Sequence, residues 1–556
     1  MRLNLSYNPL QIPSIFDNVL IFGGLYYAWM LLIVCWAIMG VKSESSKALP
    51  ICMFALVFFG IWAFQNPLGF GTDSIGNAAY AKYLIEVGTI PLNHPNFEYF
   101  DFPGLYLVTS AITQITGLGV LQVKTLVWIL TILVLSLGIF LTYRGILDYS
   151  SLAALLVFQG NIVLASLNLY QPSFFALVFF VMVLMLLQRG DSLLRTPQGQ
   201  LATILLGAGA TVTHLPTALF ASSILLGAYL LSRKRSDGLR FPFILFFLVI
   251  PLVWQLFWAV RFTRDLIVGG LPSVPGPSVP GPSVLEALFG TRLQYMFILA
   301  RRNLSGEASL WIRLTRVFWL GLVFGLGSVL GFWKLRKLSK LGTVARIEVG
   351  GFLGIFVLSI LSVVFSPAGE QFYRFLQYAG FLTVPILMWS VLGHRKAKRI
   401  SLIFLITALV VLSFPTFLAY NSTVSFNSIY RHDFSPGQFL QSEYGTGKEL
   451  TVFTNLNMPY ILSYDLPDAH YKVEQYPIGL TEVSHWQSLN ELVTEFEYSA
   501  NQRDFPVVYV FAERPVLAYQ IVFMIQPTSS GWLQVENRLS LTNMVYANGF
   551  DQIYTS

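Results

Sequence analysis

The sequence has little charge and few cysteines. Only 11% of its 556 residues are charged, against about 25% in soluble globular domains, and 55% are hydrophobic, with a mean hydropathy of +0.62. This scarcity of charge excludes an ordinary soluble domain as the class of the whole chain. The two cysteines, Cys35 and Cys52, lie within apolar runs, so the sequence predicts no disulfide framework.

Apolar runs take the place of the missing charge. Runs of about 16–22 residues, each long enough or nearly so to cross a bilayer, recur along most of the chain. They are Leu20–Met39, Leu49–Phe64, Leu121–Tyr143, Phe174–Leu187, Phe241–Val260, Trp319–Trp333, Val349–Phe365, Leu376–Leu392 and Leu402–Ala419, with less regular runs at Pro103–Gly117, Ser151–Leu169 and Leu201–Leu231. The sequence therefore predicts an α-helical polytopic membrane protein with roughly 11–13 transmembrane helices. The number depends on whether His214-Leu215-Pro216 divides the last run into two half-helices or kinks one long span.

Charge is distributed unevenly between the two parts of the chain. Of the 28 acidic residues, 14 follow Tyr420, together with only 6 of the 35 basic ones. Basic clusters follow apolar runs at Arg233–Arg235, Lys334–Lys337 and Arg395–Arg399. By the positive-inside rule these loops face the cytoplasm and the acidic tail faces outward. Binding to anionic lipid is the alternative role of the basic clusters, and it leaves the orientation unchanged.

Two domains are expected. Residues 1–420 form the transmembrane domain, with outer loops at 65–103 and 261–312, and residues 421–556 form a small extracytoplasmic α/β domain. In the second domain, Thr451–Phe453 and Val507–Phe511 are typical of strands, Gln487–Tyr498 of a helix, and Asn548-Gly549 of a hairpin turn. Within the second outer loop, the repeat SVPGPSVPGPS predicts an extended segment, either a passive linker or a mobile cover over a site.

Titratable residues gather between Gly71 and Gly104, at the edge of a predicted span. Alanines and larger apolar residues at 78–85 predict a short amphipathic helix on the outer surface. Asp73 precedes this helix, where a capping role is the alternative, and Asp101 precedes the next apolar run. Two carboxylates at the ends of one loop, with His94 and Glu98 nearby, suit a divalent cation or a base that accepts a proton from a hydroxyl group.

The same stretch carries a family resemblance. Asp73, Ala81, Ile85, Gly88-x-Ile90-Pro91 and the aromatic-rich segment from Tyr99 to Gly104 together resemble the GT-C superfamily, polytopic glycosyltransferases that use polyprenyl-phosphate-linked sugars. Where many members have Tyr-Pro-Pro-Leu, this chain lacks the second proline. The segment from Pro367 to Pro385, which contains Glu370 and Arg374, resembles the arginine-bearing outer loop of archaeal and bacterial members, and the end of the tail resembles their outer C-terminal domains.

The resemblance implies an inverting glycosyltransferase in which Asp73 acts as a base or holds a metal near the acceptor. Asp101 is a second catalytic candidate on its position alone, and Asp73 with Asp101 would hold a Mg or Mn ion. A second acidic motif that many members carry is not evident here.

Cationic side chains at the membrane surface would stabilise the leaving phosphate of the donor. Arg374 is the first candidate for this role, with Arg301, Arg302 and Arg261 as alternates. Arg374 is equally an interfacial anchor or an ion-pair partner of Glu370, four residues earlier. His214 is a cavity candidate at a helix break, with a packing role as its alternative.

Three functions remain open on the sequence. The first is transfer of a sugar from a polyprenyl-phosphate donor to a glycan, lipid or protein acceptor at the outer face of an archaeal or bacterial plasma membrane, with membrane lipids and no nucleic acid as partners. The second is a transporter or flippase of lipid-linked or small solutes, which commonly shows internal repeats that are not evident here. The third is a non-catalytic membrane scaffold that presents the C-terminal domain. A cavity containing Asp73, Asp101 and Arg374 would favour the first, and a continuous polar path the second.

Overall fold

The structure is a computed structural model of the chain. It describes residues 28–29, 31–33, 36, 44–60, 72–90, 98–144, 146–147, 149–160, 170–188, 196–232, 241–259, 310–336, 343–365, 370–392, 398–421, 434–445, 450–454, 458–473, 492–499, 506–512, 538–539, 543–547 and 551–555. The repeat at 273–283 lies outside the described residues.

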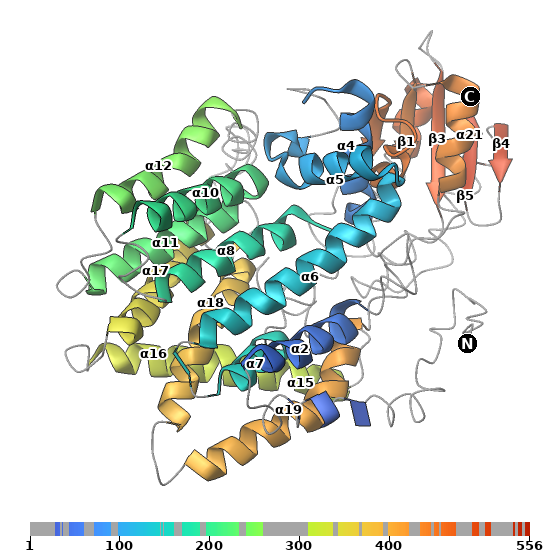
Figure 1. Cartoon of the computed structure of the whole chain (residues 1–556). Helices are drawn as coiled ribbons and strands as arrows, with labels where there is room; N and C mark the ends of the chain where they lie inside the picture. The colour runs from blue at the N-terminus through green and yellow to red at the C-terminus, as the bar shows by residue number, and fades with distance from the viewer. Residues whose placement is uncertain are drawn as a thin grey trace, which may run out of the picture.

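Helices make up the described part of the chain between residues 44 and 421 (Figure 1). Within a bilayer, each backbone N–H and C=O group must find a partner inside its own segment, and a helix meets this requirement. The α-helices are α2 (Glu44–Ala55), α4 (Thr72–Val87), α5 (Gly104–Thr116), α6 (Val120–Arg144), α7 (Ser150–Gly160), α8 (Pro172–Gln188), α10 (Pro197–Thr213), α11 (Leu215–Ser232), α12 (Phe241–Phe257), α15 (Leu310–Trp319), α16 (Gly327–Leu335), α17 (Thr343–Phe365), α18 (Glu370–Leu392) and α19 (Lys398–Asn421). The segments η2 (Leu56–Gly60), η3 (Glu98–Asp101) and η5 (Leu320–Leu326) accompany them, and η5 joins α15 to α16.

The run predicted at 201–231 forms two helices that fold back on each other at His214. α10 ends at Thr213 and α11 begins at Leu215, so a single residue with extended backbone separates them. Phe247 of α12 contacts both arms. A Cβ added at Gly207, in α10, would lie 2.3 Å from the Phe247 ring, and the Ser222 hydroxyl, in α11, donates to the Phe247 carbonyl at 3.1 Å. Because residues at similar distances before and after the break meet the same neighbour, α10 and α11 form a helical hairpin.

α11 and α17 pack with their backbones in close contact. A Cβ added at Gly227 would lie 2.0 Å from the Gly350 carbonyl oxygen, and one added at Gly354 would lie 2.0 Å from that of Ser223. Ser223 and Gly227, and Gly350 and Gly354, are each four residues apart, so two small-residue pairs face each other. This spacing lets transmembrane helices approach closely where burial of apolar surface supplies little drive.

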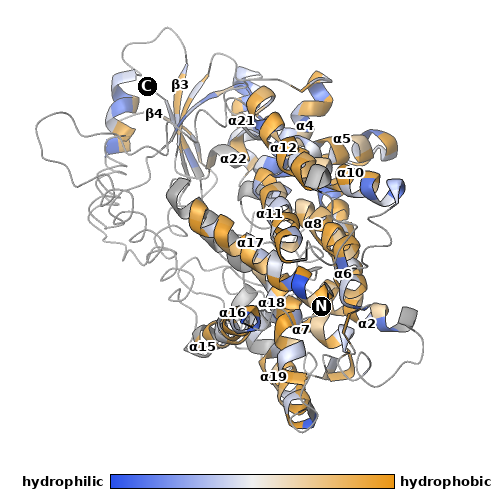
Figure 2. Cartoon of the chain, turned by 90° about the vertical axis from the view of Figure 1, so that its left-hand side faces the viewer, coloured by the Kyte–Doolittle hydropathy of each residue, from blue (hydrophilic) through white to orange (hydrophobic). Residues whose placement is uncertain are grey.

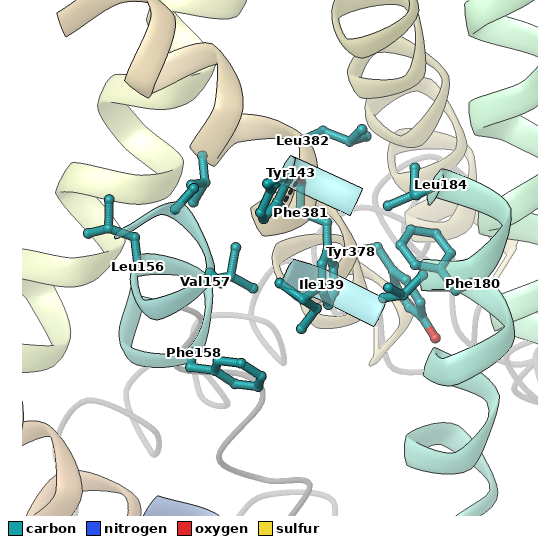
Figure 3. Close-up of a cluster of buried hydrophobic side chains, with 14 of the residues drawn as sticks. Ile139, Tyr143, Leu156, Val157, Phe158, Phe180, Leu184, Tyr378, Phe381 and Leu382 are labelled. Carbon is teal, nitrogen blue, oxygen red and sulfur yellow. Dashed lines mark hydrogen bonds between the residues drawn. The ribbon is translucent and has the colours of Figure 1, made fainter. Parts of the chain in front are cut away.

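A buried apolar cluster holds the middle of the bundle together. Figure 3 shows part of it, where Tyr143 of α6, Phe158 of α7, Phe180 of α8 and the Tyr378–Leu382 segment of α18 converge. The Tyr143 hydroxyl donates to the carbonyl of Phe381 at 2.7 Å, and Tyr378 packs against Phe180 with ring centroids 4.8 Å apart. α18 is therefore fixed from several sides.

The outer faces of the helices are apolar, as expected of a protein in lipid. Leu205, Leu252 and Val329 are 61%, 56% and 64% exposed, and Figure 2 shows the helices largely in the colour of hydrophobic residues. In water, such extensive apolar exposure would promote association. Among the described residues, three helices are long and apolar enough to cross a membrane, Val120–Arg144, Val317–Leu335 and Val344–Leu361, and seven further apolar helices are shorter. The protein is a helical membrane protein, and the number of 11–13 crossings stays a prediction.

The C-terminal part contains a five-stranded sheet in the order β2-β1-β3-β5-β4. The strands are β1 (Thr451–Thr454), β2 (His470–Val473), β3 (Val507–Ala512), β4 (Asn543–Ala547) and β5 (Asp551–Thr555). β1 pairs in parallel with β2 and β3, whereas β5 runs antiparallel to β3 and β4. The strands predicted at 451–453 and 507–511 are confirmed, as is the hairpin around Asn548-Gly549.

Helices cover the sheet. α21 (Ser435–Tyr444) and α22 (Met458–Leu462) contribute to one apolar cluster with β1 and β3. On another cluster of the sheet, Phe496, from a helical segment at 492–499, packs against Phe453 and Tyr509 with ring centroids 5.7 and 5.6 Å apart. The sheet lies close to α4 and α5, at one end of the helical bundle (Figure 1).

Candidate functional site

Asp73 is the second residue of α4. Its side chain is outside the described residues, but its place in the first turn is fixed by the helix bounds. The N-terminus of a helix carries a partial positive charge, which favours the ionised form of a carboxyl group in the first turn. By helical periodicity, position 73 shares a face of α4 with Asn77 and Tyr80, four and seven residues later.

That face of α4 packs on α5 and η3. The Tyr106 hydroxyl donates to Asn77 Oδ1 at 2.8 Å, and Asn77 Nδ2 donates to the Tyr170 carbonyl at 3.0 Å. Tyr80 lies between two rings, stacked on Tyr106 at 4.7 Å and edge-on to Phe100 at 5.0 Å. Because Phe100 immediately precedes Asp101, the face of α4 that carries position 73 meets the segment that carries the second predicted carboxylate.

α4 differs from the predicted surface helix. Every described side chain from Ser74 to Ala81 is buried, not only those on one stripe. The prediction of a helix at 78–85 is correct, but its exposure along one face is wrong, and its place at the outer side of the membrane stays a prediction. The physical reason is that α5 covers one face of the helix and the C-terminal domain covers the other.

Asp101 ends η3 and is buried, with 8% of its surface exposed. Its carbonyl accepts a hydrogen bond from Trp254 Nε1 at 3.0 Å, and Trp254 stacks on Trp258 at 5.3 Å. Both tryptophans belong to the last turns of α12 or follow it directly. The segment at 98–101 is therefore attached to the end of α12.

The start of α5 meets the break between α10 and α11. A Cβ added at Gly104 would lie 2.3 Å from Thr213 Oγ1, so only glycine permits this approach. The next residue, His214, is 9% exposed, and its Nδ1 lies 2.8 Å from Thr217 Oγ1. Thr217 in turn shares a hydrogen bond with the Tyr378 hydroxyl of α18. A chain of contacts thus links the loop after Asp101 to α18.

Arg374 lies one turn before Tyr378 on α18, which begins at Glu370. Residues four apart share a face of a helix, so position 374 lies on the face that the His214–Thr217 chain reaches. The side chains of Arg374 and Glu370 are outside the described residues, and the choice between a phosphate-binding role and an ion pair with Glu370 stays open.

The structure thus links the elements that carry four of the predicted residues. The beginning of α4, the segment η3, the α10–α11 break and the first turns of α18 are connected by the contacts described above, and they carry Asp73, Asp101, His214 and Arg374. Glu98 begins η3 without a described side chain, and His94, Arg301 and Arg302 lie outside the described residues.

Several contact residues of this region could not be predicted from the sequence. Tyr106, Thr213, Trp254 and Tyr378 occur in apolar runs, where nothing distinguishes them from residues that simply pack in the bundle. Asn77 was also missed, because its helix was predicted to lie on the surface, where an amide needs no partner in the protein.

No group of three or more His, Cys, Asp or Glu side chains that could hold a metal ion occurs among the described residues. Asp101 supplies a carboxylate of the kind that divalent cations bind. The Mg or Mn site formed by Asp73 with Asp101 stays a prediction, because the Asp73 side chain lies outside the described residues.

The described residues form a helical membrane protein with a small five-stranded sheet at one end of the helical bundle. No family model matches the chain, and no curated protein matches it. Among solved structures, it is similar to ArnT from Cupriavidus metallidurans in the apo state, with a TM-score of 0.49 and 12% identity over 96% of this chain and 98% of that one. The same enzyme bound to undecaprenyl phosphate matches with a TM-score of 0.46 and 12% identity over 92% of this chain and 98% of that one.

The chain is also similar to the Archaeoglobus fulgidus oligosaccharyltransferase tethered with an acceptor peptide. The TM-score is 0.49 and the identity 11%, over 89% of this chain and 72% of that one. The TM-scores of these matches lie below 0.5, and the chemistry of this chain is argued from its own residues.

Proposed function

We propose that the protein is a GT-C-type membrane glycosyltransferase, which transfers a sugar from a polyprenyl-phosphate donor to an acceptor at the outer face of the plasma membrane. The observation that carries this proposal is the set of contacts linking the beginning of α4, η3, the α10–α11 break and the first turns of α18. Candidate residues from four distant parts of the sequence lie on these elements.

In the proposed reaction, Asp73 accepts the proton of the acceptor hydroxyl as its oxygen attacks the anomeric carbon of the sugar. The bond between that carbon and the phosphate oxygen breaks, and polyprenyl phosphate leaves with the bonding electrons. A single displacement of this kind inverts the anomeric centre. The first-turn position of Asp73 favours the ionised carboxylate that a base requires.

The negative charge that develops on the leaving phosphate requires a cation. Arg374 would supply it, with Arg301 and Arg302 as alternates. At the edge of a membrane, water is partly excluded, so a positive charge stabilises the phosphate more than it would in bulk solvent. Tyr378 and the His214–Thr217 pair would fix the orientation of the helix that carries Arg374.

A divalent cation would be held by Asp73 and Asp101. When bound, it would supply positive charge next to the reacting oxygens. The backbone carbonyl of Asp101 accepts a hydrogen bond from Trp254, which attaches the segment that carries this carboxylate to α12.

The proposed orientation places the C-terminal domain, residues 421–556, on the extracytoplasmic side. Its acidic balance and the basic clusters that follow apolar runs in the sequence support this arrangement through the positive-inside rule. The donor would keep its polyprenyl tail in the bilayer and present phosphate and sugar beneath this domain.

The test is sugar transfer by the purified protein in lipid. A panel of radiolabelled polyprenyl-phosphate sugars is offered to the wild type and to Asp73→Asn, with and without added Mg²⁺ or a chelator. We expect Asp73→Asn to lose transfer by about 100-fold or more, the range of general-base catalysis. Loss of activity on chelation would support the metal site.

Glu86→Gln is the matched control. It removes a carboxylate from the exposed end of the same helix, and it should transfer sugar at the wild-type rate. Binding of a donor without transfer would identify the acceptor as the missing substrate. If no donor binds, and Asp73→Asn behaves like the wild type, the glycosyltransferase proposal is wrong and transport becomes the better hypothesis.

A further inference from the structure

Lys82 lies on the face of α4 opposite to Asp73. The two residues are nine positions apart, about two and a half turns of an α-helix. Ile75, by contrast, is seven positions before Lys82, about two turns, and shares its face. Ile75 is fully buried in the apolar cluster of the C-terminal domain, together with Leu462 and Val508. This face of α4 therefore meets the C-terminal domain, while the Asp73 face meets α5.

Three contacts join Lys82 to the segment that follows α22. Lys82 Nζ donates to the Tyr464 carbonyl at 2.6 Å. It also lies 3.6 Å from Asp465 Oδ1 and 4.4 Å from the centroid of the Tyr464 ring. A carbonyl, a carboxylate and the face of an aromatic ring are the groups that an ammonium ion binds.

A neighbouring contact supports the same attachment. The Tyr83 hydroxyl donates to Asp468 Oδ1 at 3.4 Å. Together with Ile75, Lys82 and Tyr83 fix both halves of α4 to a segment almost four hundred positions later in the sequence.

The ion pair of Lys82 with Asp465 is largely shielded from solvent. The Asp465 side chain is 9% exposed and that of Lys82 26%. Removing one partner of a buried pair is strongly unfavourable, because the other charge is left without compensation. Loss of Lys82 would therefore affect the contact between α4 and the C-terminal domain far more than loss of a surface lysine.

We propose that Lys82 is a positioning residue: through Tyr464 and Asp465 it fixes α4 to the C-terminal domain and so holds the face of α4 that carries Asp73 against α5 and η3. This inference rests on the proposed function of Asp73. It makes the C-terminal domain part of the catalytic framework of the enzyme, because α4 is held between that domain and α5.

The experiment compares the full-length wild type in lipid with Lys82→Met and Lys82→Arg. Hydrogen exchange of the amides in α4 is measured without any donor, and kcat and KM are measured with the donor that the wild type accepts. For Lys82→Met we expect α4 exchange to accelerate by about tenfold or more. We expect kcat to fall about 10- to 100-fold, as for a misplaced catalytic group, with KM for the donor nearly unchanged.

For Lys82→Arg we expect α4 exchange and kcat to stay close to those of the wild type. A guanidinium group can donate to the carbonyl and the carboxylate and can stack on the ring. Lys472→Met is the matched control. Lys472 pairs with Glu495 and lies 5.4 Å from the Phe453 ring, so it has the same kinds of partner, but all of them belong to the C-terminal domain. This variant should leave α4 exchange and turnover unchanged.

The two measurements separate this inference from the function on which it rests. Unchanged α4 exchange in Lys82→Met would overturn the attachment, whatever the turnover. Faster exchange with unaltered kcat would overturn the positioning role. If the wild type turns over no donor, the proposed function fails together with the catalytic role of Lys82, and the exchange data still decide whether Lys82 fixes α4.

Discussion

Asp465 shows how a single carboxyl group is affected by its place between two parts of the molecule. Burial raises its pKa above the ordinary value of 3.8, because the ionised form loses solvation. Lys82 opposes this rise, whereas the negative charge of Glu86, also on α4, adds to it. The ammonium group of Lys82 is thus the main factor that opposes the rise in the pKa of Asp465.

This balance predicts a pH dependence for Lys82→Met. Without the cation, the pKa of Asp465 rises further, because the causes that lower it are removed and burial still disfavours the ionised form. A group with a raised pKa contributes stability at low pH and loses it as pH rises through that pKa. We expect the midpoint of thermal unfolding of Lys82→Met to be lower than that of the wild type above the raised pKa of Asp465, and the difference to shrink as pH falls through that pKa.

The pH effect is measured by thermal unfolding of the two proteins in detergent. When Asp465→Asn is added to Lys82→Met, the difference in unfolding midpoint from the wild type should vary less with pH, since the amide does not titrate. A gap between Lys82→Met and the wild type that stays constant with pH would contradict the role assigned to Asp465.

At the scale of elements, the contact between α11 and α17 depends on glycine. A Cβ at Gly227 would lie 2.0 Å from the carbonyl oxygen of Gly350, and the obstacle is backbone, which cannot turn away as a side chain can. By contrast, a Cβ at Gly321, in η5, meets nothing within 4 Å. The two glycines thus provide a matched pair of sites.

We expect Gly227→Ala to destabilise the protein by about 1–3 kcal/mol, the usual cost of overpacking, despite the better helix propensity of alanine. Gly321→Ala should be neutral or slightly stabilising, by up to about 1 kcal/mol. Thermal unfolding in detergent compares both with the wild type. Equal midpoints for the two variants would show that α11 and α17 are not in backbone contact.

At the scale of the whole molecule, the orientation in the membrane is open to direct measurement. Tyr498 is 63% exposed in the C-terminal domain, and Arg336 is exposed at the end of α16. In a background without Cys35 and Cys52, Tyr498→Cys should react with a membrane-impermeant maleimide on intact cells. Arg336→Cys should react only after permeabilisation, because basic loops face the cytoplasm.

The reverse labelling pattern would invert the proposed topology and place the site on the cytoplasmic side. Reaction of both variants in intact cells would instead point to leaky cells, which a cytoplasmic marker protein detects. The labelling of these two positions therefore tests the orientation, and the cytoplasmic marker protein shows whether the cells were intact.

The sequence by itself determined the helices of the bundle and several strands of the C-terminal domain. The run predicted at 121–143 is α6, Val120–Arg144, and that at 349–365 lies within α17. Such predictions succeed because lipid allows an apolar segment few structures other than a helix, and because Asn-Gly specifies a tight turn locally. Asp73 and Asp101 could be chosen as site candidates for a related reason. Ionisable residues beside apolar runs cost free energy, so they are few.

Only the tertiary structure decided how these pieces meet. The hairpin at His214, the enclosure of α4 and the contact of Lys82 with Tyr464 involve residues whose partners lie far away in the sequence, 382 positions in the last case. A lysine near an exposed helix end and an aspartate in a loop carry no local sign of each other. Their pairing depends on which surfaces fit when the C-terminal domain packs on the bundle, and side-chain shape and burial across the whole fold determine that fit.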